Sequence, residues 1–475
     1  MSEKNTLVFT IDAQITPSDY TSLVDFIYQN YVTPNLKNFT NVVRSVSETG
    51  CFLYFTAVDP DRKWYIDVQI SIGKPIDVRM LLSSSEVPES AVRWLRSNLV
   101  TAVRFFEEQR RKTTVYFTWV EGEEIIPERV LEARKNFVYR MFSESMLLLF
   151  ILFTSLSIIL FLILGSYAPI ALVLMQFTLI LFSDRIIGRM GDWRITEKNP
   201  MIHVFQYNIP VSEYKSFLNK HGVEIFSKIK KDIYSRTLAL RKPINYETCA
   251  EVLSQYGLEC NPEKASAKIV NLYEIVKQAA ERFELPVPRI VVSNTTLPNA
   301  AASGPWPRRG VILVTTGLLV QLDEREILSV IGHEFSHLKG RDPLIFFLLT
   351  SIEYLLRFYV FWPLLYFLGY FYLILALGAV YFIAKFFESK ADLESAIRIG
   401  EPQTLANALR KIGFRRLQLE TRREYAIQEW VGWDPHPPLY FRISRLESLE
   451  EPGKIRHPLI RSIKDNIRGF LEIIG

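Results

Sequence analysis

The chain has 475 residues, of which 49% are hydrophobic and 23% are charged, and its formal net charge is +5. This length exceeds one ordinary globular core, so we expect two or three domains. The small positive charge, with no conspicuously basic face or tail, speaks against a nucleic-acid partner and favours a membrane surface. Three widely spaced cysteines without a CxxC pair predict no disulfide framework and a reducing compartment.

Residues 1–140 are predicted to form a soluble α+β domain of unknown role. The N-terminus, MSEKNTLVFTIDAQ, lacks the build of a signal peptide, so this domain is expected in the cytoplasm. Period-two alternation predicts strands, and apolar residues at helical spacing predict helices. The strands are Leu7–Ile11, Phe52–Val58, Trp64–Ile72 and Thr113–Trp119, and the helices are Ser18–Tyr31 and Ala91–Arg110.

Two apolar blocks predict two transmembrane helical hairpins, at 141–190 and 343–385. In the first block, Met146–Leu164 and Ala168–Phe182 are separated only by Gly-Ser-Tyr, which predicts a tight turn. The second block, Leu344–Ala384, is about twice the length of one span. Buried helices of a large soluble core are the alternative, which the length of the uncharged runs disfavours.

Positive charges predict the orientation of the hairpins. They stand before and after each apolar block, and the two hairpin tips carry no charge, so the positive-inside rule places both termini and all soluble parts in the cytoplasm of a multi-pass membrane protein. The flanking charges are Arg134, Lys135, Arg140, Arg185, Arg189, Arg194, Lys339, Arg341, Lys385 and Lys390. Within the third span, Glu353 and Arg357 stand one helical turn apart, and mutual pairing is expected in preference to a polar cavity.

Residues 195–265 are predicted to be an insert of charged helical stretches and loops. Ser266–Phe283 then has the spacing of an amphipathic helix. Pro286–Val292 and Gly310–Thr315 are expected to be strands, with an edge strand in the small-residue run Leu297–Gly304 between them.

The strongest functional signal is the run His333-Glu334-Phe335-Ser336-His337. It lies in the predicted helix Glu324–Lys339, with Asp323 as its expected N-cap, so the two imidazoles stand one turn apart and reach a single ion. Zinc accepts neutral imidazole at this spacing. Glu334 would stand beside the metal, take a proton from the zinc-bound water and deliver it to the leaving amine. The alternative is a helix with two exposed histidines, but a chance match is rare in a chain with only six histidines.

A hydrolytic zinc site needs a third protein ligand and an open position. Glu388 is the best candidate, because it follows the second hairpin as the His333 helix precedes it, and a hairpin returns its chain close to where it left. This places the metal at the cytoplasmic membrane surface. Asp392, one turn further along, is expected to receive the outer N–H of a ligand imidazole. The alternative for Glu388 is a solvated residue at the membrane interface.

The run EREILSVIGHEFSHLKGRD resembles the HtpX-like membrane metalloproteases, the peptidase family that also includes the CAAX prenyl protease. That family pairs its two-histidine helix with a later Glu-x-x-x-Asp, an Asn-Ala edge-strand motif and a His-Pro segment followed by arginine. The resemblance covers about Ile269 to Leu449, and the matching residues are Glu388, Asp392, Asn299, Ala300, His436 and Arg442.

The resemblance implies a role for each of these residues. Glu388 would be the third zinc ligand and Glu334 the catalytic base. His436 would stabilise the oxyanion, and Arg442 would orient the site or the substrate, pairing with Asp392. The segment Asn299-Ala300 would hold an extended peptide by adding it to the sheet edge.

The expected fold class is therefore α+β. It comprises the N-terminal soluble domain, two transmembrane hairpins and a zincin-type metalloprotease domain with a small sheet, split into 266–342 and 386–475. The resemblance implies a zinc-dependent endopeptidase with one Zn²⁺ per chain. It would cut peptide or membrane-protein substrates at the cytoplasmic face of the lipid bilayer in membrane-protein quality control. The long segments before the protease core depart from the family pattern.

Three alternatives stay open. An intramembrane protease also uses a His-Glu-x-x-His helix, but Glu324–Asp342 is too charged to be a span. A non-catalytic membrane adaptor with a vestigial zinc site would not require Glu334. A prenyl-protein-type processing protease would need a larger helical membrane chamber than four predicted spans provide.

Overall fold

The computed structural model describes residues 6–11, 13, 15, 17–47, 50–59, 63–73, 75–84, 87–111, 114–123, 125, 146–209, 211–222, 224–420, 423–432 and 434–474. The flanking charges Arg134, Lys135 and Arg140 lie outside these residues. The chain forms two compact units. Unit 1 combines Met1–Phe117 with Phe205–Lys268, and unit 2 combines Thr118–Val204 with Ile269–Gly475.

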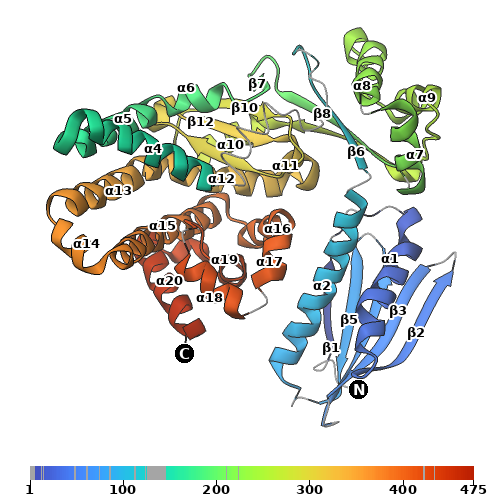
Figure 1. Ribbon diagram of the computed structural model, residues 1–475. Helices are drawn as coiled ribbons and strands as arrows, with labels where there is room; N and C mark the ends of the chain where they lie inside the picture. The colour runs from blue at the N-terminus through green and yellow to red at the C-terminus, as the bar shows by residue number, and fades with distance from the viewer. Residues whose placement is uncertain are drawn as a thin grey trace. The chain divides into compact units, whose positions relative to one another are not determined.

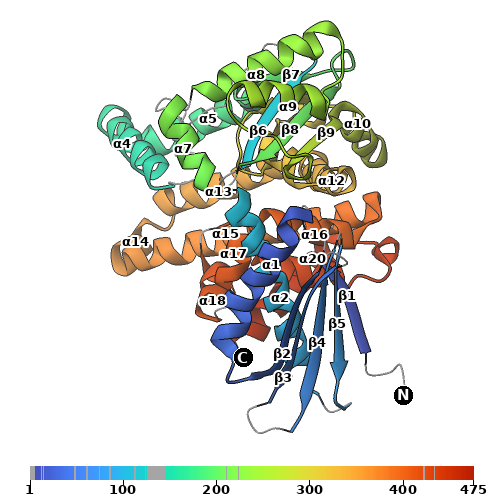
Figure 2. The same cartoon turned by 90° about the vertical axis from the view of Figure 1, so that its right-hand side faces the viewer.

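A five-stranded antiparallel sheet forms the core of unit 1, in the order β1-β5-β4-β3-β2. Along β4, Ile66, Val68 and Ile70 are buried and alternate with more exposed residues, because successive side chains of a strand point to opposite faces. Helices α1 (Tyr20–Ile27) and α2 (Glu89–Arg111) cover the buried face (Figure 1) (Figure 2). The strands are β1 (Thr6–Ile11), β2 (Phe39–Ser47), β3 (Gly50–Val58), β4 (Tyr65–Ile72) and β5 (Ile76–Leu82).

Strands β1, β3 and β4 confirm the sequence prediction, whereas β2 and β5 were not predicted. Strand β2 is irregular, because its pairing with β3 shifts register between Thr40 and Val43, and Asn41 has a φ of 52°. That irregularity breaks the period-two alternation on which a strand prediction rests.

Residues 201–271 contain helices α7 (Val211–His221), α8 (Ile225–Arg236) and α9 (Tyr246–Gln255). A three-stranded sheet has the order β6-β8-β9, with β6 at Thr114–Val120, β8 at Met201–Asn208 and β9 at Ala265–Asn271.

The predicted helix over Ser266–Phe283 is wrong in its first turns. Residues up to Asn271 belong to β9, and the helix α10 begins at Leu272 and ends at Phe283. The Asn271 side chain accepts the Glu274 N–H and caps α10, because its oxygen bonds one of the donors that a helix start leaves unpaired. Pairing in the sheet decides the conformation of the first residues, and local spacing does not reveal such pairing.

A four-stranded sheet in unit 2 has the order β11-β12-β10-β7. Strands β10 and β12 are parallel, and β11 runs antiparallel to β12 with its other edge open within this sheet. This arrangement confirms the two predicted strands and the edge strand between them. The strands are β7 (Trp193–Ile195), β10 (Arg289–Ser293), β11 (Ala300–Ser303) and β12 (Val311–Thr315).

The apolar helices of unit 2 lie side by side. Helix α4 (Met146–Leu164) turns back into α5 (Ala168–Leu181), and α5 contacts α13 (Asp342–Tyr359) (Figure 1). Helix α13 leads through α14 (Trp362–Leu368) into the long α15 (Tyr370–Ile399). Glu353 accepts the Arg357 Nε–H at 3.0 Å, which confirms the expected pair within α13.

By length and composition, fewer helices qualify as membrane spans than the four that the sequence predicted. Among the described residues, two helical runs are long and apolar enough to cross a membrane, Thr154–Leu181 and Tyr370–Ile399. Helices α13 and α14 meet at a bend of 80° and would add a third span if they act as one. The four-span arrangement stays a prediction.

Helix α12 (Glu324–Gly340) packs against α15, and this contact builds the site. Gly332 permits the close approach, because a Cβ there would lie 2.7 Å from Ile399 and 2.9 Å from the Ser395 hydroxyl. Helix α16 (Pro402–Ile412) contacts both members of this pair. Further helices of unit 2 are α6 (Ser183–Gly188), α11 (Thr316–Gln321), α17 (Phe414–Glu420), α18 (Arg423–Val431), α19 (Leu439–Glu447) and α20 (Pro458–Ile474).

Candidate metal centre

Helix α12 begins at a capping box, as expected of Asp323. Its side chain accepts the Glu326 N–H, and the Glu326 carboxylate accepts the Asp323 N–H in return. The helix ends at Gly340, and its C-cap Arg341 has a φ of 54°, which turns the chain sharply into α13. The helix therefore holds His333 and His337 one turn apart near its C-terminal end.

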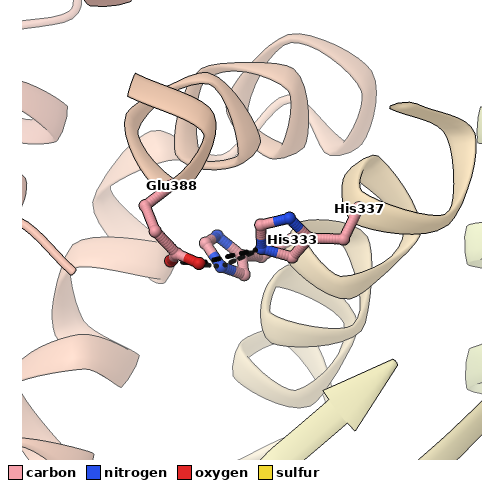
Figure 3. A group of neighbouring side chains, drawn as sticks. All are labelled: His333, His337 and Glu388. Carbon is pink, nitrogen blue, oxygen red and sulfur yellow. Dashed lines mark hydrogen bonds and ion pairs between the residues drawn. The ribbon is translucent and has the colours of Figure 1, made fainter. Parts of the chain in front are cut away.

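Three side chains converge from two helices, as Figure 3 shows: His333 and His337 from α12, and Glu388 from α15. The two histidine Nε2 atoms are 3.2 Å apart. Glu388 Oε2 lies 3.4 Å from His333 Nε2, and Glu388 Oε1 lies 3.3 Å from His337 Nε2. All three side chains are at most 14% exposed.

Carboxylates hold the far side of both imidazoles. Asp392 Oδ1 lies 2.9 Å from His333 Nδ1, and Asp342 Oδ2 lies 2.9 Å from His337 Nδ1. A carboxylate opposite Nδ1 favours the proton on that nitrogen, and in this tautomer the Nε2 lone pairs face one another and the Glu388 carboxylate. Lone pairs and a negative charge gathered in a buried site repel one another unless a cation lies between them.

The donor set fits a zinc ion. Tetrahedral ligands about 2.0–2.1 Å from Zn²⁺ stand about 3.3 Å from one another, which agrees with the separations of the three donor atoms. Burial lowers the pKa of His333, but its contacts with Asp392 and Glu388 outweigh burial and raise that pKa overall. The carboxylates thus favour positive charge at the position where a metal would supply it. Among the residues that the structure describes, none donates a hydrogen bond to the buried Glu388 Oε2.

Glu334 lies between this group and the sheet edge. Its Oε2 accepts the Ala302 N–H at 2.7 Å, so the carboxylate faces strand β11. Since the Ala302 N–H points away from β12, Ala300, two residues earlier on the strand, has the same orientation. Asn299 differs, because its N–H donates to the Thr315 hydroxyl and its carbonyl accepts the Thr315 N–H. The open edge therefore begins at Ala300.

Arg442 and Asp392 form a buried bidentate pair. Arg442 Nε and Nη2 donate to the two Asp392 oxygens at 2.8 and 2.7 Å. Burial raises the pKa of Asp392, but the charges and hydrogen bonds of Arg442 and His333 together outweigh burial and hold that pKa well below its usual range. Arg442 therefore reaches the metal group through Asp392 and His333.

His436 approaches the group from the segment before α19. Its Nε2 lies 3.7 Å from Glu388 Oε2, and its Nδ1 lies 2.8 Å from Asp434 Oδ1. Arg416 Nη1 holds the other Asp434 oxygen at 2.9 Å. Burial raises the pKa of Asp434, but His436 and Arg416 outweigh burial and keep it well below its usual range.

Two carboxylates of this group, Asp342 and Asp434, were not predicted from the sequence. Asp342 also accepts Lys390 Nζ at 3.2 Å and follows directly on the two-histidine helix. Asp434 stands two residues before His436. Their proximity in sequence to a ligand or a site histidine was the available signal.

Comparison with known proteins agrees with this geometry. Residues 266–450 match a family model described as "Peptidase family M48". A curated "Protease HtpX homolog" from Thermodesulfovibrio yellowstonii is 30% identical over 231 residues, which cover 42% of this chain and 80% of that relative. The chain belongs to peptidase family M48. It is an HtpX-like M48 protease, and its family implies a metal.

The matches to other relatives with the same description cover different shares of each relative. The protein from Desulforapulum autotrophicum is 31% identical over 240 residues, covering 42% of this chain and 75% of the relative. The protein from Thermococcus kodakarensis is 43% identical over 94 residues, covering 20% of this chain and 31% of the relative. The M48 model begins at residue 266, so the N-terminal region and the 195–265 segment lie before the matched part.

Proposed function

We propose that this M48 peptidase is a zinc endopeptidase, anchored in a membrane, that cuts extended segments of membrane proteins. The observation that carries the proposal is the convergence of His333, His337 and Glu388 beside Glu334 and an open sheet edge. One Zn²⁺ per chain would occupy the group. Bound there, zinc would polarise the scissile carbonyl and acidify a water molecule.

The chain's own residues would position the peptide and move the proton. A substrate pairs with the outward N–H and C=O groups of β11, and displaces the Ala302 N–H from Glu334. Glu334, freed from that bond, accepts a proton from the attacking water and delivers it to the leaving amine. His436, which is 45% exposed, turns its Nε2 toward the site and stabilises the developing oxyanion. Arg442 holds Asp392 and through it the His333 ring.

The membrane placement rests on the order of the elements. Helix α12 leads directly into α13, and Glu388 follows the apolar part of α15, so the metal group stands where the second hairpin begins and ends. Positive residues flank the hairpins, which favours a cytoplasmic site and cytoplasmic termini in a multi-pass protein. A site at that level suits the removal of damaged or misfolded membrane proteins.

The test replaces Glu334 by Gln and measures bound zinc and casein cleavage on detergent-purified protein. We expect one zinc per chain in both proteins and a loss of about 10²–10⁴-fold in cleavage, because the ligands remain and the base is removed. Glu324→Gln is the matched control, since Glu324 is an exposed glutamate in the first turn of the same helix. Its cleavage should equal that of the unaltered chain.

Other outcomes would point elsewhere. Zinc in neither protein at neutral pH would contradict the ligand assignment. Zinc without cleavage in the unaltered chain would favour the adaptor with a vestigial site. Cleavage confined to prenylated peptides would favour the processing-protease alternative.

A further inference from the structure

The loop between β11 and β12 reaches the end of the first apolar hairpin. Arg309 Nη2 donates to the Leu181 carbonyl at 2.9 Å and pairs with Asp184 at 2.7 Å. Leu181 is the last residue of α5, and Asp184 lies in α6, which follows it. The loop 304–310 is therefore fixed at the point where the chain leaves the apolar hairpin.

The two segments that Arg309 joins carry exposed aromatic, aliphatic and basic side chains. Phe182, Ile186 and Trp306 are 41%, 43% and 39% exposed. We call the whole set the interfacial patch, and it consists of Phe182, Arg185, Ile186, Arg189, Trp306 and Arg308.

The interfacial patch carries an excess of positive charge. Arg185, Arg189 and Arg308 are exposed and form no ion pair with any residue that the structure describes. Across 181–189 and 304–310, Asp184 is the one acidic residue, and it is buried against Arg309. The patch thus offers three exposed guanidinium groups to an anionic partner.

The patch continues the apolar surface of α5. Leu174, Phe177 and Leu179 are 60%, 38% and 53% exposed, and the chain then passes from Leu181 into Phe182. Aromatic rings next to arginines at the end of an apolar helix match the headgroup layer of a bilayer. Aromatic rings lie at the boundary between the apolar and polar regions of a bilayer, and arginines bind lipid phosphates.

We propose that the interfacial patch binds the headgroups of anionic phospholipids and thereby holds strand β11 at the bilayer surface. The inference rests on the membrane anchoring of the proposed function and adds a lipid partner and a substrate class to it.

The coupling to β11 is short and stiff. Trp306 stands four residues after Ala302, a reach of about 13 Å at most in extended chain. Gly304 closes the loop with a φ of 144°, where a Cβ would lie 2.5 Å from the Arg309 carbonyl oxygen. Lipid bound at the patch therefore sets the depth of the edge to which substrate adds. Segments directly next to a membrane span would be cut in preference to segments far from the bilayer.

The first experiment measures lipid selectivity on the full chain. Purified protein in detergent is mixed with equal amounts of phosphatidylglycerol and phosphatidylcholine, and retained lipid is identified by native mass spectrometry. The test variant is Arg185→Gln with Arg308→Gln. The matched control is Lys277→Gln with Arg325→Gln, which removes two exposed cations, one on α10 and one at the end of α12 away from the hairpins.

The unaltered chain and the control should retain phosphatidylglycerol selectively. The test variant should lose about fivefold in affinity for each arginine removed, on the order of 25-fold together. Unchanged selectivity in the test variant, or an equal loss in the control, would overturn the proposal.

The second experiment asks whether lipid, and not a protein surface, covers the patch. In nanodiscs of brominated phospholipid, Trp306→Phe should reduce the lipid-quenched part of the tryptophan fluorescence. Trp94→Phe, which removes an exposed tryptophan of α2, is the control and should leave that part unchanged. An unaltered quenched part in Trp306→Phe would refute lipid contact. Neither readout depends on zinc or cleavage, so failure here is distinct from failure of the peptidase assignment.

Discussion

At the scale of single residues, the site is held by carboxylates that orient its imidazoles. Asp392 and Asp342 each face the Nδ1 of one histidine, and each is bound in turn by a cation, Arg442 or Lys390. Gly340 makes room for the second of these pairs, because a Cβ there would lie 2.2 Å from Asp342 and 2.3 Å from Lys390. Orientation of a ligand ring by such a partner raises metal affinity by fixing the tautomer.

Asp342→Asn should weaken zinc binding by about 10- to 100-fold, because the amide no longer fixes the His337 proton on Nδ1 with a negative charge. Competition with a chelator of known affinity measures the change. Asp465→Asn is the control. Asp465 forms ion pairs with arginines of α19 and α20 and does not contact the metal group. Equal zinc affinity in Asp342→Asn and the unaltered chain would show that Asp342 does not support His337.

At the scale of elements, α12 carries both site histidines and also a buried ion pair that ties it to another helix. The first turn of α12 carries Glu326. The Glu326 carboxylate pairs with Lys411 Nζ at 2.8 Å, and each of the two side chains is 4% exposed. Burial raises the pKa of Glu326 overall, although the Lys411 charge opposes this. The pair ties α12 to α16 and so fixes the helix that holds both histidines.

Lys411→Met should destabilise unit 2 by about 3–5 kcal/mol, because it leaves the buried Glu326 carboxylate without its cation. The midpoint of denaturant unfolding in detergent, followed by tryptophan fluorescence, measures the loss. Adding Glu326→Gln to the same chain should restore most of the stability, since the amide is neutral and still accepts the Asp323 N–H. A double variant no more stable than Lys411→Met would assign the loss to packing.

At the scale of the whole molecule, the N-terminal part of unit 1 has a hydrophobic core of its own. The buried cluster runs from Ile11 to Phe106 and joins the five-stranded sheet to α1 and α2. Two of its members, Phe39 and Phe55, have ring centroids 4.7 Å apart, and both are at most 2% exposed. Among the residues that the structure describes, every buried member of this cluster lies between Ile11 and Phe106.

A fragment of residues 1–111 should therefore fold alone. Circular dichroism should show strand and helix together, and the fragment should unfold cooperatively. Phe55→Ala in the fragment should cost about 3–5 kcal/mol, because the deleted ring leaves a cavity in a packed core. A fragment that is unfolded without the rest of the chain would contradict an independent core.

The sequence by itself determined what depends on local backbone geometry. The four-residue spacing of His333 and His337 places both rings on one helical face. The length of the apolar runs predicts helices that can span a membrane. Helix continuity likewise predicted the helix that carries both histidines and its Asp323 cap. The sequence also indicated Glu388, because a hairpin brings its two ends together.

Only the tertiary structure decided which distant groups meet. The Ala302 N–H at Glu334, the Asp342 and Asp434 carboxylates beside the imidazoles, and the Arg309 contact with Leu181 all join separate elements. The strand at the start of Ser266–Phe283 belongs with them, because pairing with other strands outweighed its helical spacing. Packing between remote segments depends on the closeness of approach and on burial, and the period of a single segment does not encode either one.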